Sequence, residues 1–249
     1  MYQYEQNNII LTQDARRVTP ITMSDTDKKC VQNAPIILGL EASGDHASAA
    51  IVKGSKVLAE ARIDQKHGHA SYFVSLAADA VAQAHLRFSD ITHIAAGVGP
   101  GSFTGLRVCL SAAKGFVLAG GLVGVGVNGL RARAFAAQDQ GIKGTIISCA
   151  DTRRGSYFAQ RYNADYEAQE TITDVTLAEL QQNDKAHDEA VIVVAPSEEA
   201  QDGISFVDMS ARHIALLADY DMTHNHDLMA LDALYVAEPK LGPSKKAAS

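Results

Sequence analysis

The sequence predicts an α/β fold, and three observations carry that prediction. Short apolar segments separated by turn residues predict several strands close together in the first part of the folded chain. Another apolar segment, Ile91 to Val98, leads through a glycine-rich turn into a long apolar helix. The hydrophobic fraction of 47% and the charged fraction of 20% are ordinary for a globular domain. We therefore expect an antiparallel meander of strands that passes into a parallel crossover unit.

Size and charge exclude some classes of protein. The 249 residues suffice for one large domain or two small ones. No apolar run approaches the roughly 18 residues that a bilayer span needs, so we expect no membrane association. The formal net charge of -7 argues against direct binding of nucleic acid, because phosphate contacts need a basic surface. Cys30, Cys109 and Cys149 are odd in number and widely spaced, which favours a reducing cytoplasm over a disulfide framework or a zinc site.

The first 34 residues are polar, and we expect residues 1–34 to form a mobile extension. They lack the long apolar core of a signal peptide. A start of translation near Met23 is a second hypothesis for this segment. The folded part then opens with strands predicted at 35–42, 47–53 and 57–63, which are joined by turns that contain glycine.

A helix is predicted next, from about Ala70 to Leu86. Its apolar residues recur at spacings of three and four, which places them on one face: Phe73, Ala77, Ala80, Val81 and Ala84. His67 and His69 precede this helix, and two histidines at that spacing can ligate a metal from a loop. No carboxylate or cysteine nearby completes a set of ligands, so solvated or core-packed histidines are the preferred interpretation.

The glycine-rich turn is the strongest local pattern in the chain. Its glycines allow positive φ and close approach to other groups, and they are Gly97, Gly99, Gly101 and Gly105. A turn of this kind before a helix either binds phosphate or only permits a sharp corner, and the residues leave both interpretations open. No Lys-Ser or Lys-Thr of a P-loop follows Gly105, and Ser102 lacks the flanking glycines of a nucleophile elbow. We therefore predict no chemistry of its own for this turn.

The helix after the turn, Leu106 to Ala119, has almost no polar face. Such a helix is either fully buried or shared with a partner, and both interpretations remain open from composition alone. Small residues would let a second helix approach closely, and they are Ser111, Ala112, Gly115 and Ala119.

The elements that follow are predicted as strand, helix and a second group of strands. Residues 122–127 form a strand, a helix runs through about Gln138, and Arg131 with Arg133 is interpreted as a solvated basic spot on it. A linker at 141–144 leads to strands at 145–150 and 155–162, with a turn at Asp151 to Gly155 between them. Asp151 and the arginines of that turn could form a catalytic acid and an anion clamp, but a hairpin turn is the preferred interpretation.

The last hundred residues carry weaker patterns. We predict a helix at 176–182, a strand at 191–195 and a helix at 210–220 with Ser210 as its N-cap. His224, His226 and Asp227 form a loose polar cluster that either binds a metal adventitiously or is solvated, and solvation is the preferred interpretation. Residues 241–249 are predicted to be a disordered tail.

Several of these segments together resemble the bacterial TsaB family, also called YeaZ. The resemblance lies in Gly99 to Arg107, in Lys114-Gly115 and in Val123 to Val127, with further matches at Ile37 to Ser43 and Asp151 to Tyr157. It covers residues from about Pro35 to about Tyr162. Within it, the loop residues that carry the family signature are Gly99, Gly101, Ser102, Thr104, Gly105 and Arg107.

The resemblance implies the actin-like, sugar-kinase-like ASKHA fold with two subdomains, here 35–140 and 141–240. Active members of that class hold a metal nucleotide with an aspartate and a threonine of the first hairpin. This chain instead has Glu41-Ala42-Ser43-Gly44, which supplies fewer hydroxyls and a longer carboxylate. We therefore assign no cofactor to this chain and expect ATP and metal on partner subunits. His69 aligns with a family histidine, and we expect its role to be structural.

The resemblance further implies a noncatalytic subunit that scaffolds and activates the enzyme TsaD. TsaD transfers threonylcarbamoyl to adenosine 37 of tRNA, and the ATPase TsaE joins the same cytoplasmic assembly. We therefore expect this chain to contact tRNA only indirectly, through the complex. The two helices form a bundle with TsaD, or with a second copy of the chain when TsaD is absent. The interface residues expected on them are Phe73, Ala77, Leu106, Cys109, Ala112, Ala113 and Phe116. Phe116→Asp is then expected to abolish partner binding more than folding.

Two other classes of function remain open from the sequence. A small-molecule kinase of the ASKHA class would need ATP and a catalytic aspartate in a cleft. A glycoprotease-like metallohydrolase would need a bound metal.

Overall fold

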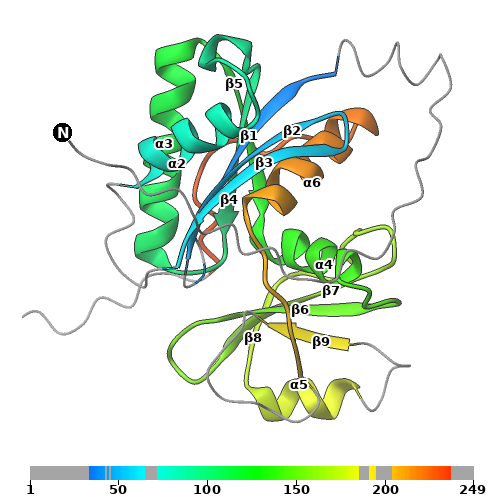
Figure 1. Ribbon diagram of the computed structural model, residues 1–249. Helices are drawn as coiled ribbons and strands as arrows, with labels where there is room; N and C mark the ends of the chain where they lie inside the picture. Colours follow the sequence, from blue (N-terminus) through cyan, green and yellow to red (C-terminus); the bar gives the residue numbers. More distant parts are fainter. Residues whose placement is uncertain are drawn as a thin grey trace, which may run out of the picture. The chain divides into compact units, whose positions relative to one another are not determined.

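The computed structural model describes residues 34–42, 44, 46–64, 72–184, 191–194 and 204–236 (Figure 1). Predictions that concern other residues lie outside this range. They are the extension up to residue 33, Cys30, Ser43, His67, His69 and the tail of residues 241–249.

The first sheet has five strands in the order β3-β2-β1-β4-β5. Their bounds are Ile36–Glu41 for β1, Ala47–Lys53 for β2, Lys56–Ile63 for β3, His93–Gly99 for β4 and Val123–Asn128 for β5. β1 pairs antiparallel with β2, and β2 pairs antiparallel with β3. β4 runs parallel to both β1 and β5. The predicted meander that passes into a parallel crossover is therefore confirmed.

Helices cover both faces of the first sheet, as the nearly continuous apolar strands require. On one face Leu38 and Leu40 of β1 share a core with α2 and α3. On the other face Ile37 shares a core with α4 and α6, because successive strand residues point to opposite faces. The helix bounds are Phe73–Gln83 for α2, Phe103–Gly120 for α3, Gly129–Asp139 for α4 and Ala211–Thr223 for α6.

One glycine allows α6 to approach the sheet. A Cβ on Gly39 of β1 would overlap the backbone oxygen of Ala211 and lie 2.8 Å from Cβ of Ala215, both in α6. The backbone of α6 therefore lies closer to β1 than any larger residue at position 39 would allow.

The second sheet has the order β10-β9-β6-β7-β8. Its strands are Ile146–Asp151 for β6, Tyr157–Tyr162 for β7, Thr173–Val175 for β8, Val191–Val194 for β9 and Ile204–Phe206 for β10. β6, β7 and β8 are antiparallel neighbours, whereas β9 is parallel to β6 and to β10. Ile146 and Ala150 of β6 join the core of α4, and Ile147 with Cys149 packs near α5, Leu177–Asp184. β8 and β10, with three residues each, are absent from the sequence-based prediction.

The chain returns to the first sheet after β10. α6 lies within the range predicted as the second subdomain, but it packs against β1 and β2. The assignment of residues 141–240 to one subdomain stays a prediction.

Candidate functional site

The glycine turn connects β4 to α3, as predicted. Gly99 has φ +103°, and the Gly99-Pro100 peptide bond is cis. Ser102 caps the helix, since its side-chain oxygen accepts from Gly105 N at 3.3 Å and its carbonyl accepts from Leu106 N at 2.9 Å. The first N–H groups of the helix are therefore partly engaged by the chain itself.

The glycines of the turn allow the first hairpin to lie against it. A Cβ on Gly105 would overlap the carbonyl oxygen of Ala42, and a Cβ on Gly97 would overlap the carboxylate of Glu41. Position 105 needs glycine because it meets backbone, whereas at position 97 the overlap is with the end of the Glu41 side chain. Of the two open interpretations, these contacts favour the structural corner.

The C-terminal segment closes the other side of the turn. Leu234 N donates to the carbonyl oxygen of Val98 at 2.8 Å, and Gly126 N of β5 donates to Met229 O at 2.7 Å. The ring of Tyr235 lies 6.3 Å from the ring of Phe103, the first residue of α3. Leu234 and Tyr235 thus lie against the two ends of the turn. No local pattern in the chain predicts that these residues return to β4 and α3.

Glu41 ends β1 in a buried position, with an exposed fraction of 1%. Arg133 of α4 is 4% exposed, lies within electrostatic range of Glu41, and donates from Nη1 to the carbonyl oxygen of Cys149. Burial lowers the pKa of Arg133, while the charge of Glu41 raises it. The interpretation of Arg133 as part of a solvated basic spot is therefore wrong, because its guanidinium lies in the interior between β6 and the end of β1.

These residues do not fit the metal nucleotide that the fold class implies. The carboxylate of Glu41 itself fills the space above Gly97, between the ends of β1 and β4. Ala42 and Gly44 provide no hydroxyl there. Within the described ranges, no group of three or more His, Cys, Asp or Glu side chains is arranged to hold a metal ion. We derive no chemical step through a nucleotide at this place.

Five of the seven residues predicted at the partner interface belong to the core of the chain. They are Phe73, Ala77, Leu106, Cys109 and Ala113, each at most 7% exposed. Burial raises the pKa of the Cys109 thiol well above its ordinary value, so it is not a reactive group. Residues with so little surface cannot supply a contact area, and the predicted residue set is corrected on this ground. Whether these helices bind a partner stays a prediction.

Ala112 and Phe116 complete the predicted set and are half-buried. The ring of Phe116 stacks on Phe88 at a centroid distance of 5.8 Å. An aspartate at position 116 would therefore disturb the packing of the chain as well as any partner contact. Phe116→Asp is a poor test of docking for this reason.

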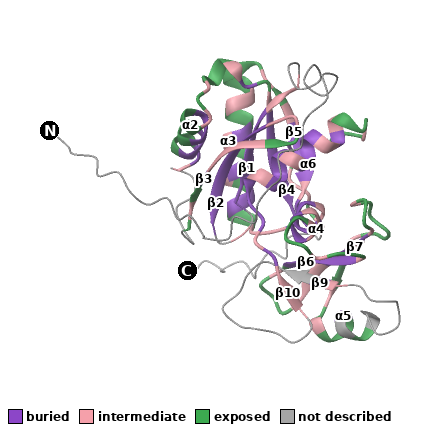
Figure 2. Cartoon of the chain, turned by 45° about the vertical axis from the view of Figure 1, so that its right-hand side comes forward, coloured by how far each residue is buried: buried purple, intermediate pink, exposed green. Residues whose placement is uncertain are grey.

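α2 and α3 expose part of their surface (Figure 2), on which small and apolar side chains lie among polar ones such as Asp79, Gln83 and Lys114. Leu118 is 87% exposed and Val74 is 66% exposed. We call the small and apolar residues of this surface the outer face, and they are Val74, Ala78, Ala82, Ser111, Gly115, Leu118 and Ala119. Gly115 is exposed, and apart from its chain neighbours and the backbone of its own helix, no described atom lies within 4 Å of the Cβ that another residue would place there.

By length and composition, α3 could cross a membrane. Its 18 residues pass that test, so the expectation that no apolar run reaches this length is wrong for this helix. Only 28% of the helix is buried, but it packs against β4, β1 and β5 and carries Arg107 and Lys114. These contacts make α3 one layer of the α/β fold.

His224, His226 and Arg131 bind other groups of the same chain, at the end of α6. His226 Nδ1 lies 2.9 Å from Asp221 Oδ1, and Arg131 Nη1 lies 2.7 Å from Asp221 Oδ2. His224 stacks on Tyr220 at 4.0 Å and contacts its carbonyl oxygen at 2.8 Å. Arg131 is thus paired rather than part of a solvated spot, and neither histidine is simply solvated.

The turn at Asp151 is a hairpin turn, as preferred from the sequence. β6 and β7 pair on either side of it. Arg153 N donates to Asp151 Oδ1 at 2.6 Å, and Arg153 has φ +57°. The aspartate therefore stabilises the local turn.

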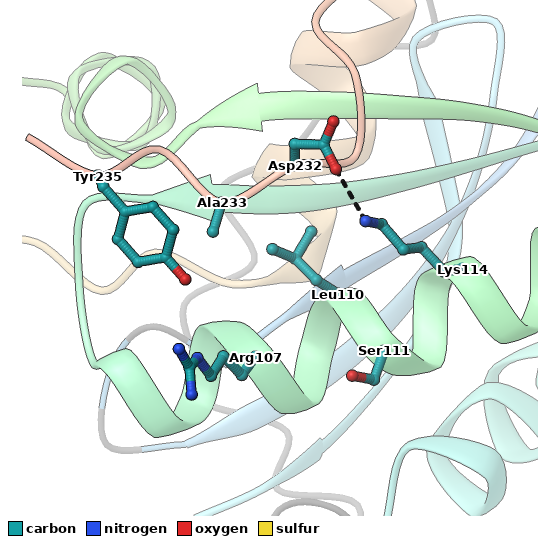
Figure 3. A pocket seen from close by; sticks show the side chains of 7 residues that line it. All are labelled: Arg107, Leu110, Ser111, Lys114, Asp232, Ala233 and Tyr235. Atoms are coloured by element: carbon teal, nitrogen blue, oxygen red, sulfur yellow. Dashed lines mark hydrogen bonds and ion pairs between the residues drawn. The ribbon is translucent and has the colours of Figure 1, made fainter.

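A groove of about 450 Å³ lies between α3 and the C-terminal segment (Figure 3). Lys114 Nζ and Asp232 Oδ1 form an ion pair of 2.8 Å at one end. Arg107 and Tyr235 lie at the other end, with the guanidinium of Arg107 stacked 3.8 Å from the ring centre of Phe103. Arg107 is a predicted signature residue, whereas the segment opposite it was not predicted to form a site.

A family model described as TsaD: tRNA N6-adenosine threonylcarbamoyltransferase matches residues 56–213, which is more than half of the chain. This chain belongs to that family. The TsaD-family chain is 34% identical over 117 residues to the tRNA N6-adenosine threonylcarbamoyltransferase of Granulibacter bethesdensis, a match that covers 41% of this chain and 32% of the relative.

A second relative is a TsaB protein. The TsaD-family chain is 26% identical over 129 residues to the tRNA threonylcarbamoyladenosine biosynthesis protein TsaB of Escherichia coli, which covers 52% of this chain and 55% of the relative. The chain spans about a third to a half of the length of these curated relatives.

Solved structures agree on the fold. YeaZ from Pseudomonas aeruginosa has a TM-score of 0.66 at 18% identity, over 81% of this chain and 100% of that chain. A structure described as an uncharacterized protein with similarity to peptidase YEAZ from Pseudomonas aeruginosa has a TM-score of 0.67 at 16% identity, over 82% and 100%. The predicted α/β ASKHA fold and the resemblance of the TsaD-family chain to TsaB (YeaZ) proteins are confirmed.

Proposed function

We propose that this chain is a noncatalytic, TsaB-like subunit of the cytoplasmic assembly that makes threonylcarbamoyladenosine at position 37 of tRNA. In this proposal it docks a TsaD-type catalytic subunit and activates it, and a TsaE-type ATPase joins the same complex. Family membership and the match to the Escherichia coli protein TsaB support a role in making threonylcarbamoyladenosine. The net charge of -7 supports a role in which tRNA is bound by other subunits.

The outer face of α3 is the observation that carries the docking proposal. A glycine inside a helix costs about 1 kcal/mol relative to alanine. At Gly115 no described atom of the chain takes advantage of the missing side chain, so the fold gains nothing from that cost. Close approach of a second backbone would use the space, and Leu118, 87% exposed next to it, would be buried by the same contact.

The partner that this face fits best is another helix pair with small residues. Ser111, Gly115 and Ala119 recur every four residues and leave a shallow path along α3. A TsaD-type subunit shares this fold by family, and it would present its own corresponding helices. A second copy of the chain could occupy the same face when the catalytic subunit is absent.

The buried ends of β1 and β4 support a noncatalytic role. Glu41 fills the space where the fold class holds its metal nucleotide, and Leu234 binds the end of β4 beside the glycine turn. A kinase of this fold would bind Mg-ATP at that place. Calorimetric titration of the isolated chain with Mg-ATP tests the point, and saturable binding there would favour the kinase alternative.

Reconstitution tests the proposed function directly. The TsaD-type and TsaE-type subunits of the same cell, with threonylcarbamoyl adenylate and unmodified tRNA, are assayed with and without this chain. Modified adenosine is expected only when the chain is present, and the chain is expected to co-purify with the catalytic subunit. Equal modification in both reactions would contradict the proposal.

A further inference from the structure

Arg107 is a preorganised cation that has no carboxylate partner among the described residues. Its guanidinium lies 3.8 Å from the ring centre of Phe103, and no hydrogen bond or ion pair engages it within the part of the chain that the structure describes. Stacking fixes the planar guanidinium while leaving its N–H groups available. The side chain lines the groove between α3 and the C-terminal segment (Figure 3).

The charges around the groove select a ligand with one negative charge. Its lining carries two cations, Arg107 and Lys114, and one anion, Asp232, which gives a formal charge of +1. Asp232 already holds Lys114 at 2.8 Å. A phosphate monoester, with nearly two charges, would place its second charge close to Asp232, whereas a single carboxylate leaves the groove neutral.

The apolar part of the lining indicates that the carboxylate belongs to a protein. Tyr235, which is 56% exposed, Leu110 and Ala233 belong to the lining, and Phe103, which is 50% exposed, lies under the guanidinium of Arg107. One exposed arginine binds a free carboxylate weakly, but the same ion pair gains strength when a protein surface covers it. Ser111 lines the groove and also belongs to the outer face, so a subunit docked on α3 reaches both.

We propose that this groove accepts a carboxylate side chain, Asp or Glu, from the catalytic subunit, which Arg107 binds through its two terminal N–H groups. The inference rests on the proposed function, because the carboxylate arrives on the subunit that docks against α3. Its role is to fix the register of docking along the helix, while the outer face supplies the apolar contact area.

The test is the affinity of the TsaD-type subunit of the same cell for variants of the full chain, measured by titration calorimetry. Arg107→Glu is expected to weaken binding by at least 30-fold, and Arg107→Lys by about fivefold, since lysine keeps the charge and loses the fork. Asp232→Asn raises the groove charge to +2 and is expected to tighten binding by two- to fivefold. Arg154→Glu makes the same charge change on the exposed β6–β7 turn and is expected to alter the affinity less than twofold.

The outcomes separate this inference from the proposed function. If the wild-type chain does not bind the catalytic subunit, the proposed function fails and the inference with it. If the wild-type chain binds and Arg107→Glu binds within twofold of it, only the inference fails. Binding of inorganic phosphate to the isolated chain that Arg107→Glu removes, with unchanged affinity for the subunit, would assign the groove to a free anion and overturn the inference.

Discussion

At Gly115, a single substitution should change the stability of the folded chain and its affinity for a partner in opposite directions. The substitution is Gly115→Arg. Arginine has a helix propensity close to that of alanine, so the folded chain should gain about 0.5–1 kcal/mol. The gain is available because no described atom lies within 4 Å of the new Cβ. For a domain of this size we expect the Tm to rise by about 1–4 °C.

The same substitution should prevent docking. An arginine side chain would occupy the space that a second helix needs beside Ser111 and Ala119. We expect the affinity for the TsaD-type subunit to fall at least 30-fold, which corresponds to about 2 kcal/mol. Gly115→Ala should give a similar rise in Tm with a smaller loss of affinity, since it adds only one methyl group.

Thermal unfolding by circular dichroism and titration calorimetry measure the two effects. Ala178→Arg, on the exposed side of α5, serves as the control for adding an arginine to a helix and should leave binding unchanged. Wild-type affinity in Gly115→Arg would refute the docking face. A fall in Tm would refute the predicted gain in stability, because it would show that the fold itself needs the glycine.

Three further predictions concern the fold that supports this face. Gly105→Ala places a Cβ against the carbonyl oxygen of Ala42 and should lower the free energy of unfolding by about 3 kcal/mol in urea titrations. Arg131→Met leaves the buried carboxylate of Asp221 with fewer partners and should cost about 3 kcal/mol in the same assay, whereas a cost below 1 kcal/mol would contradict the role given to that ion pair. Burial lowers the pKa of His213 in the folded chain below its ordinary value of 6.5. The stability that the neutral ring contributes is therefore complete above about pH 6.5 and is lost as the pH falls toward the lower pKa of the folded state. Urea midpoints measured between pH 7.5 and 5.5 should fall in the wild type and fall less in His213→Gln.

The pH prediction has a structural cause in the start of α6. His213 Nδ1 accepts a hydrogen bond of 3.0 Å from the backbone N–H of Ser210, which caps the helix. A protonated ring has no acceptor at Nδ1, so protonation removes the cap. A flat stability profile in the wild type would show that the ring remains neutral over this range or that the cap contributes little.

Local patterns in the sequence sufficed to predict most of the helices and strands. Strands predicted at 35–42 and 47–53 appear as β1 and β2, and the glycine turn joins β4 to α3 where it was expected. These predictions succeed because strand apolarity, turn glycines and helix caps are properties of neighbouring residues. The three-residue strands β8 and β10 lack a pattern of their own and form only by pairing with longer neighbours.

The candidate site was predicted less well, and α3 shows why. A helix that is apolar on all sides has no periodicity to mark its buried face, so Leu106, Cys109 and Ala113 of α3 were assigned to a surface that they hardly reach. The pairing of Arg131 with Asp221 joins residues 90 positions apart, which no local pattern indicates. The return of residues 229–235 to the glycine turn is hidden for the same reason.

That return has a consequence for how the protein is made. A ribosome that has finished β5 at Asn128 must add 106 more residues before Leu234 can bind Val98, and α6 emerges only shortly before. At common rates of translation this takes about 5–20 s. Until α6 has been made, the nascent first sheet has all five strands, but the apolar face that α6 covers in the folded chain is exposed. Chaperones or other chains can bind that face during this interval.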